Sequence, residues 1–335
     1  MTLIKTYSVN VIKSMNLISK RYIHYRQKDG YTKNIGSILE YMVSITSNGI
    51  VNKEAIVVYG TAGSGKGKLL DHYKTIDPKV NQYINLNLDN HIYNSNSYKS
   101  QVHSHNITIL KQIISDLKKK HNALGIKYTL CGRIWTEKLD VLNKILSDNL
   151  NGNALSLQDI TTLRYFITYL LHFEKPFYDL FMTSTIALYY AHRNTSELIN
   201  ETMLNLALYF GNGIIFETTG KNLASMSNTL KKISDKGYNI VFLYPFVSDI
   251  EILHKRVLSR GIVEGRFLSF DNFATTHQRS IDNYNTYIRQ YLQINVPNTK
   301  RIIIADNSTS ILKSLYDYPT HDIQSAEIMQ LPILR

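Results

Sequence analysis

Five short apolar runs recur along this chain between residues 55 and 306, each bounded by polar residues or by glycine. Runs of this length that are rich in Val, Ile and Phe predict buried β-strands. Between them lie segments whose apolar residues repeat at helical spacing. Strands that alternate with helices predict an α/β fold with a doubly wound parallel sheet. The five predicted strands are residues 55–59, 83–89, 213–217, 239–245 and 301–306.

From about residue 104 to residue 210 the pattern is helical throughout, with few Gly or Pro residues. Ile107, Leu110 and Ile114, for example, fall on one face of a helix. We therefore expect a large all-helical insertion between two strands of the core. The helices predicted from residue 157 onwards are 157–172, 174–191, 195–210, 222–236, 248–260 and 271–293.

These patterns divide the chain into three expected parts. Residues 1–50 are polar and basic and predict a helical N-terminal arm. The α/β core comprises residues 51–100 and 210–335, and residues 101–209 form the helical insertion subdomain. No run has the length of a transmembrane helix. Residues 1–28 contain no acidic residue, which fits a basic arm and leaves an organellar targeting segment as the alternative.

A glycine-rich segment joins the first predicted strand to the helix that follows it. The segment reads Gly60-Thr61-Ala62-Gly63-Ser64-Gly65-Lys66, and this strand–loop–helix context is that of a P-loop. Glycines let successive backbone N–H groups surround a phosphate, and a lysine adds positive charge near the outer phosphates. The sequence therefore predicts a nucleoside triphosphate site. Its candidate residues are Gly60, Gly63, Ser64, Gly65, Lys66, Gly67 and Lys68.

The residues after Lys66 depart from the general P-loop pattern. Many P-loops place a Ser or Thr directly after the lysine to hold Mg²⁺, and here that residue is Gly67, followed by Lys68. The Gly-Ser-Gly-Lys-Gly run resembles that of adenylate kinase, in which Thr stands at the position of Lys68. We therefore expect Mg²⁺ to be held through water or by a carboxylate from elsewhere in the chain.

Polar residues follow the next two predicted strands at the edge where the glycine segment lies. Asp89 ends the second strand, and Glu217, Thr218 and Thr219 end the third. Phosphoryl transfer needs a carboxylate to orient or deprotonate the acceptor hydroxyl, which suits Asp89. Glu217 is a candidate for binding substrate or for holding Mg²⁺ through water, and the two threonines offer donors to a phosphate or sugar. The alternatives are a loop cap for Asp89 and an ion pair with Lys66 or an arginine for Glu217.

A basic segment follows the fourth predicted strand. Arg256 and Arg260 are four residues apart and share a helix face. Gly261 and Gly265 are expected to turn the chain so that Arg266 returns. Guanidinium groups bind phosphate oxygens in bidentate fashion, so this segment predicts an arginine-bearing lid over the triphosphate. The alternative is a solvated basic helix.

The composition is that of a globular protein, and its charge favours anionic binding partners. The chain has 38 Lys and Arg against 26 Asp and Glu, a net charge of +12, which favours nucleotides, nucleic acid or acidic surfaces as partners. A generic basic surface is the alternative. The single cysteine, Cys131, excludes intrachain disulfides and cysteine zinc clusters and suits a reducing compartment such as the cytoplasm. Abundant Lys, Asn, Ile and Tyr are typical of AT-rich genomes, including those of some large DNA viruses.

Taken together, these motifs resemble the zeta-toxin family of P-loop kinases. The resemblance covers roughly residues 53–95 and 210–310. It implies a nucleotide-kinase fold and transfer of the γ-phosphoryl group of ATP or GTP to a hydroxyl, in the best-known members on a UDP-linked amino sugar. Ile92 stands where the family commonly has a basic residue. By this resemblance Lys66 binds phosphates, Asp89 is the base, Glu217 supports substrate or metal, and Arg256, Arg260 and Arg266 are lid cations.

The sequence thus favours an ATP-dependent, Mg²⁺-using kinase that acts on a hydroxyl-bearing small molecule, such as a nucleotide-sugar. Two alternatives remain open. The net charge of +12 favours a polynucleotide kinase. Gly67, Lys68 and Ile92 favour a degenerate P-loop protein that binds nucleotide without turnover, as a structural or virion component.

Overall fold

The structure is a computed structural model that describes residues 46, 49–93, 96–123, 130–294, 298–308 and 313–319. The expected N-terminal arm lies outside the described residues, apart from residues 46, 49 and 50. The chain divides into two compact units. The sheet unit comprises Met1–His91, Arg193–His254 and Phe270–Arg335, and the helical unit comprises Ile92–His192 and Lys255–Ser269.

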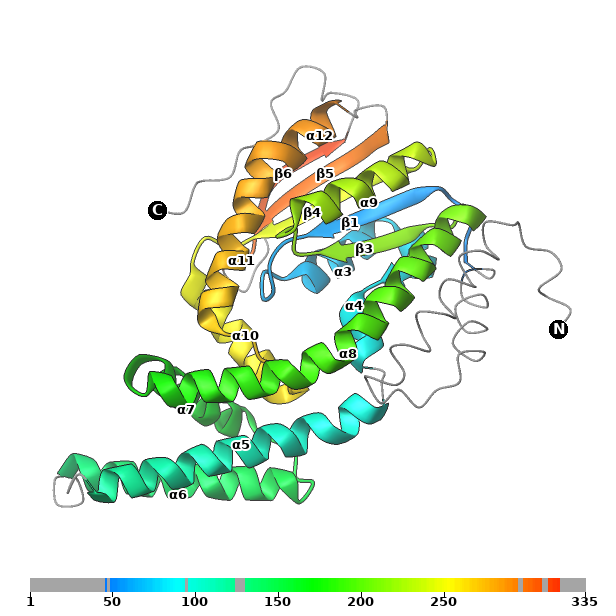
Figure 1. Cartoon of the computed structure of the whole chain (residues 1–335). Helices are drawn as coiled ribbons and strands as arrows, with labels where there is room; N and C mark the ends of the chain where they lie inside the picture. The colour runs from blue at the N-terminus through cyan, green and yellow to red at the C-terminus, as the bar shows by residue number, and fades with distance from the viewer. Residues whose placement is uncertain are drawn as a thin grey trace, which may run out of the picture. The chain divides into compact units, whose positions relative to one another are not determined.

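A six-stranded sheet in the order β2-β3-β1-β4-β5-β6 forms the centre of the sheet unit (Figure 1). Every pairing from β2 to β5 is parallel, which confirms the α/β class and the five predicted parallel strands. The strands are β1 (Glu54–Tyr59), β2 (Ile84–Leu86), β3 (Ile214–Thr218), β4 (Asn239–Phe246), β5 (Thr299–Asp306) and β6 (Lys313–Pro319).

The sixth strand was not predicted. β6 pairs with β5 and runs antiparallel to it at the edge of the sheet. Its sequence, Lys-Ser-Leu-Tyr-Asp-Tyr-Pro, mixes polar and apolar residues and lacks the continuous apolar run used to find the other strands. An antiparallel edge strand needs only one buried face, so this weaker pattern is sufficient for it.

Helices cover both faces of the sheet, as a doubly wound fold requires. Alternate residues of β1 point to opposite faces. Ile56 and Val58 pack with Leu69 and Leu70 of α3 (Lys66–Ile76) in one core cluster. Ala55, Val57 and Tyr59 of β1 point to the other face and belong to a second cluster. This cluster includes residues of α9 (Leu223–Asp235) and of three consecutive helical segments, α11 (Phe270–Asn283), η4 (Tyr284–Ile288) and α12 (Arg289–Ile294).

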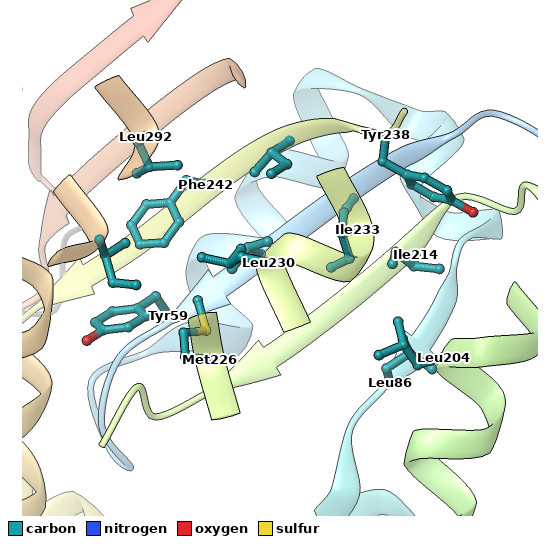
Figure 2. Packing of buried hydrophobic residues seen from close by; sticks show 14 of the residues in the cluster. Tyr59, Leu86, Leu204, Ile214, Met226, Leu230, Ile233, Tyr238, Phe242 and Leu292 are labelled. Carbon is teal, nitrogen blue, oxygen red and sulfur yellow. The ribbon is translucent and has the colours of Figure 1, made fainter. Parts of the chain in front are cut away.

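The second cluster holds α9 against the strands (Figure 2). Met226, Leu230 and Ile233 recur along one side of α9 and are buried with Ile214 of β3 and Phe242 of β4. Burying an aliphatic side chain of this size contributes about 1.5–3 kcal/mol. This burial therefore holds α9 against β3 and β4.

The second strand is shorter than predicted. β2 ends at Leu86, and Asp89 lies in the first turn of a short helix, α4 (Leu88–Tyr93), rather than at the end of a strand. The reason is local, because the side-chain oxygen of Asn87 accepts a hydrogen bond from the backbone N–H of Asp89 at 2.9 Å. An asparagine in this position caps a helix and ends the strand before it.

The fourth strand extends one residue beyond its predicted end at Pro245. Pro245 pairs with Ala305 of β5, and β4 continues to Phe246. On the other side of β4, pairing with β1 stops at Leu243. A proline is tolerated in a strand where its missing N–H has no ladder partner to serve.

The remaining helices are mostly in the helical unit. Between the predicted helices 174–191 and 195–210 no glycine or proline intervenes, and a single helix, α8 (Lys175–Phe210), replaces the two. No helix among the described residues is long and apolar enough to cross a membrane. The others are α5 (Asn96–Ala123), α6 (Leu130–Leu150), α7 (Leu157–Phe173) and α10 (Ile250–Glu264), with a short 3₁₀ turn at Pro78–Gln82 in the sheet unit.

Candidate functional site

The candidate site lies at the carboxyl edge of the sheet, where β1 and β3 end side by side. Tyr59 pairs with Thr218 in the parallel ladder, and Val58 pairs with Glu217. Gly60, the first residue after β1, donates its N–H to the Thr218 carbonyl at 3.1 Å. The strand order also reverses at β1, because the chain passes from β1 to β2 and β3 on one side and then to β4 on the other. Ligands of open α/β sheets bind at such a reversal.

The segment Gly60–Lys66, here called the glycine loop, closes on itself. Gly60, Gly63 and Gly65 have φ values of 135, 79 and 98°, a region that favours glycine. The carbonyl of Thr61 accepts hydrogen bonds from the Ser64 backbone N–H at 3.3 Å and from the Ser64 hydroxyl at 2.9 Å. The loop therefore has a defined conformation in which its glycines are required.

Lys66, the first residue of α3, folds back over the loop. Its ammonium group donates to the carbonyl oxygens of Gly60 at 2.8 Å and Thr61 at 3.2 Å. Lys68 lies in the same first turn of α3, which contains no acidic residue. The N-terminus of a helix carries a partial positive charge, so two lysines there raise the local potential further. This arrangement favours an anion.

Asn307, which follows β5, holds the loop from another side. Its side-chain nitrogen donates to the Ser64 carbonyl at 2.8 Å, and its side-chain oxygen accepts from the Lys68 ammonium at 3.3 Å. A Cβ atom on Gly65 would lie 2.0 Å from the Asn307 nitrogen. One side chain therefore fixes both the loop backbone and the second lysine.

The carboxylates predicted for chemistry come from β3 and from the turn after β2. Glu217 is half-buried, and within the described part of the chain no hydrogen bond or ion pair to its carboxylate is found. The expected alternative, an ion pair with Lys66, is not what the structure shows, since that ammonium donates to loop carbonyls. Asp89 is also half-buried and belongs to the sheet unit.

The threonines after Glu217 have partly local roles. The Thr218 hydroxyl oxygen accepts a hydrogen bond from the Gly220 N–H at 3.1 Å, which closes the turn after β3. Gly220 has a φ of 68°, and a Cβ atom there would lie 2.0 Å from the ring of Tyr59. Thr219 is half-buried beside this turn. The end of β3 is thus held closely against the end of β1.

Helix α11 supplies a residue that the sequence reasoning missed. His277 is 3% exposed, and its Nδ1 lies 3.1 Å from the hydroxyl oxygen of Thr61 in the glycine loop. Burial lowers the pKa of the His277 imidazole, and the backbone of Val247 offsets part of that effect. A signal was present, because His277 falls on the buried side of a predicted helix together with Phe273 and Ile281. Polarity at such a position indicates a specific partner.

The three arginines of the predicted lid belong to the helical unit. Arg256 and Arg260 lie on α10, where the Nε of Arg260 pairs with Glu264 at 2.6 Å. The guanidinium of Arg266 lies 4.4 Å from the ring centre of Tyr189. The side chains of Arg260 and Arg266 therefore both make contacts within the helical unit.

The expectation that both glycines turn the chain after α10 was wrong for one of them. Gly265, with a φ of 81°, ends the helix, whereas Gly261 lies inside it. A Cβ atom on Gly261 would lie 2.7 Å from the carbonyl oxygen of Arg266. Gly261 is thus explained by the close return of the chain and not by a turn.

The described part of the chain contains no group of three or more His, Cys, Asp or Glu side chains that could bind a metal ion without other ligands. Mg²⁺ in phosphoryl-transfer sites is usually bound by one or two carboxylates together with substrate phosphates and water. The half-buried carboxylate of Glu217 fits that mode of binding.

Comparisons with known proteins place few limits on this chain. No family model matches it. A stretch of 94 residues is 33% identical to the uncharacterized protein L872 of Acanthamoeba polyphaga mimivirus. This stretch is 27% of the present chain and 28% of that relative, so the chain matches little more than a quarter of the relative's length.

One solved structure, from the PezAT chromosomal toxin–antitoxin system of Streptococcus pneumoniae, aligns with a TM-score of 0.43 and 12% identity. The alignment covers 84% of this chain and 79% of that one. Similarity at this level supports no functional inference, so the function is argued from the residues of this chain.

Proposed function

We propose that the carboxyl edge of the sheet binds a nucleoside triphosphate and transfers its terminal phosphoryl group to a hydroxyl of a small molecule. The observation that carries the proposal is the glycine loop at the strand-order reversal. There, Lys66 and Lys68 share the first turn of α3 without an acidic neighbour in that turn. Two cations at the positive end of a helix repel each other and the helix dipole, and an anion bound there offsets that repulsion. A triphosphate supplies that anion.

In this proposal the loop N–H groups and the two lysines bind the phosphates. Lys66 exchanges the carbonyl oxygens of Gly60 and Thr61 for phosphate oxygens when the nucleotide enters. Glu217 lies beside the loop, because it pairs with Val58 across the ladder. It would hold Mg²⁺ through water, and the metal would neutralise charge on the phosphates. ATP is the expected donor, with GTP as the alternative.

Asp89 is proposed to receive the proton of the acceptor hydroxyl. The acceptor oxygen forms a bond to the γ-phosphorus while the bond from that phosphorus to the β–γ bridging oxygen breaks. The nucleoside diphosphate leaves, and the hydroxyl proton passes to the Asp89 carboxylate. The arginines Arg256, Arg260 and Arg266 are proposed to support charge on the transferring group when the lid segment closes.

The deciding experiment uses the purified full chain with γ-labelled ATP or GTP and Mg²⁺. The acceptor panel contains UDP-sugars, nucleoside monophosphates and 5′-hydroxyl oligonucleotides. Lys66→Ala is the test variant, and Lys74→Ala, in the last turn of the same helix, is the matched control. Transfer that is lost in the first variant and kept in the second supports the proposal. Absence of ATP and GTP binding by the unmodified chain would overturn it.

A polynucleotide kinase is the second candidate, and one observation favours it. The helical unit contains 15 Lys and Arg against 8 Asp and Glu, more than half of the net charge of the chain. It also exposes Tyr165 and Phe173 on α7. Cations and exposed aromatic rings are the groups that single-stranded nucleic acids contact. Transfer to the oligonucleotide arm of the panel, weakened steeply by salt, would identify this function.

Binding of nucleotide without transfer to any acceptor would identify a third function, that of a degenerate nucleotide-binding module. Gly67 and Lys68, which replace hydroxyl residues, favour that outcome. The mimivirus relative and the residue usage support a viral source, and the proposed place of action is then the cytoplasm of the infected cell or the virion.

A further inference from the structure

The contact between His277 and Thr61 joins two segments that are 216 residues apart in sequence. Both residues are buried, Thr61 at 2% and His277 at 3% exposure. Thr61 is central to the glycine loop because its carbonyl accepts from Ser64 and from the ammonium of Lys66. A side chain that fixes Thr61 therefore fixes the carbonyl around which the loop folds.

Helix α11 is itself anchored at the carboxyl edge of the sheet. One turn after His277, the carbonyl of Ser280 accepts from the Tyr59 hydroxyl at 2.5 Å. One turn further, the side-chain nitrogen of Asn283 donates to the Gly220 carbonyl at 2.7 Å. Residues three apart lie on neighbouring turns of one helix side. Successive turns of α11 thus contact the glycine loop, the end of β1 and the turn after β3.

This anchoring affects how much conformational entropy the glycine loop loses when a ligand binds. A binding loop that is already in its bound conformation loses less conformational entropy when the ligand arrives, and its affinity is correspondingly higher. Sites of this kind are held by supporting side chains whose own positions are fixed by packing and hydrogen bonds. His277 has both properties, since it is packed on a helix that Tyr59 and Gly220 hold in place.

We propose that His277 is a positioning residue of the nucleotide site, which holds Thr61 and thereby keeps the glycine loop in the conformation that receives phosphate. This inference rests on the proposed nucleotide binding and adds to it a residue that no P-loop motif contains. His277 acts through Thr61 and does not itself contact the nucleotide. A purely structural role is the competing explanation, in which His277 fills space and affects only stability.

Three substitutions separate these explanations. His277→Leu keeps a side chain of similar bulk and removes the hydrogen bond. His277→Asn places a polar atom close to the position of Nδ1 and is expected to restore the bond to Thr61. Thr61→Val removes the same bond from the other side. The control is His254→Asn, because His254 is equally buried in the sheet unit and packs on Phe270 and Phe273.

The first measurement is ATP affinity, with folding checked by thermal unfolding. A lost buried hydrogen bond is worth about 1–3 kcal/mol, or roughly 5- to 150-fold in a dissociation constant. We expect His277→Leu and Thr61→Val each to weaken ATP binding by about 10-fold, with little further loss in the double variant because the two share one interaction. His277→Asn should recover most of the affinity, and His254→Asn should keep it. Unchanged affinity in both single variants that remove the bond would overturn the proposal.

The second measurement needs no nucleotide. Amide hydrogen exchange at residues 61–66 should be faster in His277→Leu than in the unmodified chain, and unchanged in His254→Asn. Equal exchange in all three proteins would overturn the positioning role. Faster exchange in a chain that binds neither ATP nor GTP would instead support positioning and reject the proposed function. If His277→Leu does not fold, Thr61→Val and His277→Asn carry the same comparison.

Discussion

The side-chain amide of Asn307 donates to the backbone carbonyl of Ser64 at 2.8 Å, so the residue that follows β5 holds the glycine loop that follows β1. The two residues are 243 positions apart in sequence. The same side chain accepts from Lys68. The loop is therefore supported by tertiary contacts as well as by its own glycines, and several outcomes of mutation depend on this support.

Gly65→Ala should disturb the loop through Asn307. The new Cβ would lie 2.0 Å from the Asn307 nitrogen, and alanine would have to adopt a φ of 98°. Backbone strain of this kind costs about 1–3 kcal/mol. We expect roughly tenfold weaker ATP binding, measured by titration of a fluorescent nucleotide analogue. Gly152→Ala is the control, because Gly152 has a similar φ of 94° and a Cβ there meets no atom within 4 Å. Equal affinities in the two variants would show that Asn307 does not constrain the loop.

Asp89→Asn should abolish useful transfer and spare nucleotide binding. The amide keeps the size of the side chain but cannot accept the acceptor proton, and loss of a positioned base costs about 10²–10⁴-fold in rate. Single-turnover transfer from γ-labelled ATP measures this. Asp71→Asn, an exposed position on α3, should keep full activity. Near-normal turnover in Asp89→Asn would remove Asp89 from the proposed mechanism.

Gly220→Ala should destabilise the sheet unit by more than backbone strain alone. Gly220 and Gly237 have nearly equal φ values, 68 and 72°. A Cβ on Gly220 would overlap the ring of Tyr59, whereas one on Gly237 meets nothing within 4 Å. The difference between the unfolding free energies of the two alanine variants therefore isolates the steric cost, expected to be about 1–3 kcal/mol. Urea unfolding of both variants gives that difference directly.

Stability should fall with acid partly because of His277. Burial lowers the pKa of His277 below its unfolded value of 6.5, so the unfolded chain binds more protons in the window below pH 6.5. Stability from this group is thus present above pH 6.5 and is lost as the pH falls toward the folded pKa. The melting temperature of His277→Asn should depend less steeply on pH between 6.5 and 5 than that of the unmodified chain. His72→Asn, at an exposed position, should not reduce the slope; equal slopes in all three proteins would contradict the assignment.

The sequence by itself determined the class of the fold and the position of the loop. The apolar runs at β1, β3, β4 and β5 are buried on both faces, and continuous apolarity is the pattern that such strands require. The glycines of the loop were equally readable, since their φ values are ones that other residues rarely adopt. The sequence pattern of a short segment is enough to predict a feature that depends on the residues of that segment.

Only the tertiary structure decided which side chains meet at the site. His277 and Asn307 contact the loop from 216 and 243 residues away, and neither belongs to a motif around Lys66. The antiparallel strand β6 likewise depends on its pairing partner β5. Hydrogen bonds between distant segments leave no periodic trace in the sequence, because each needs only one polar residue at one buried position.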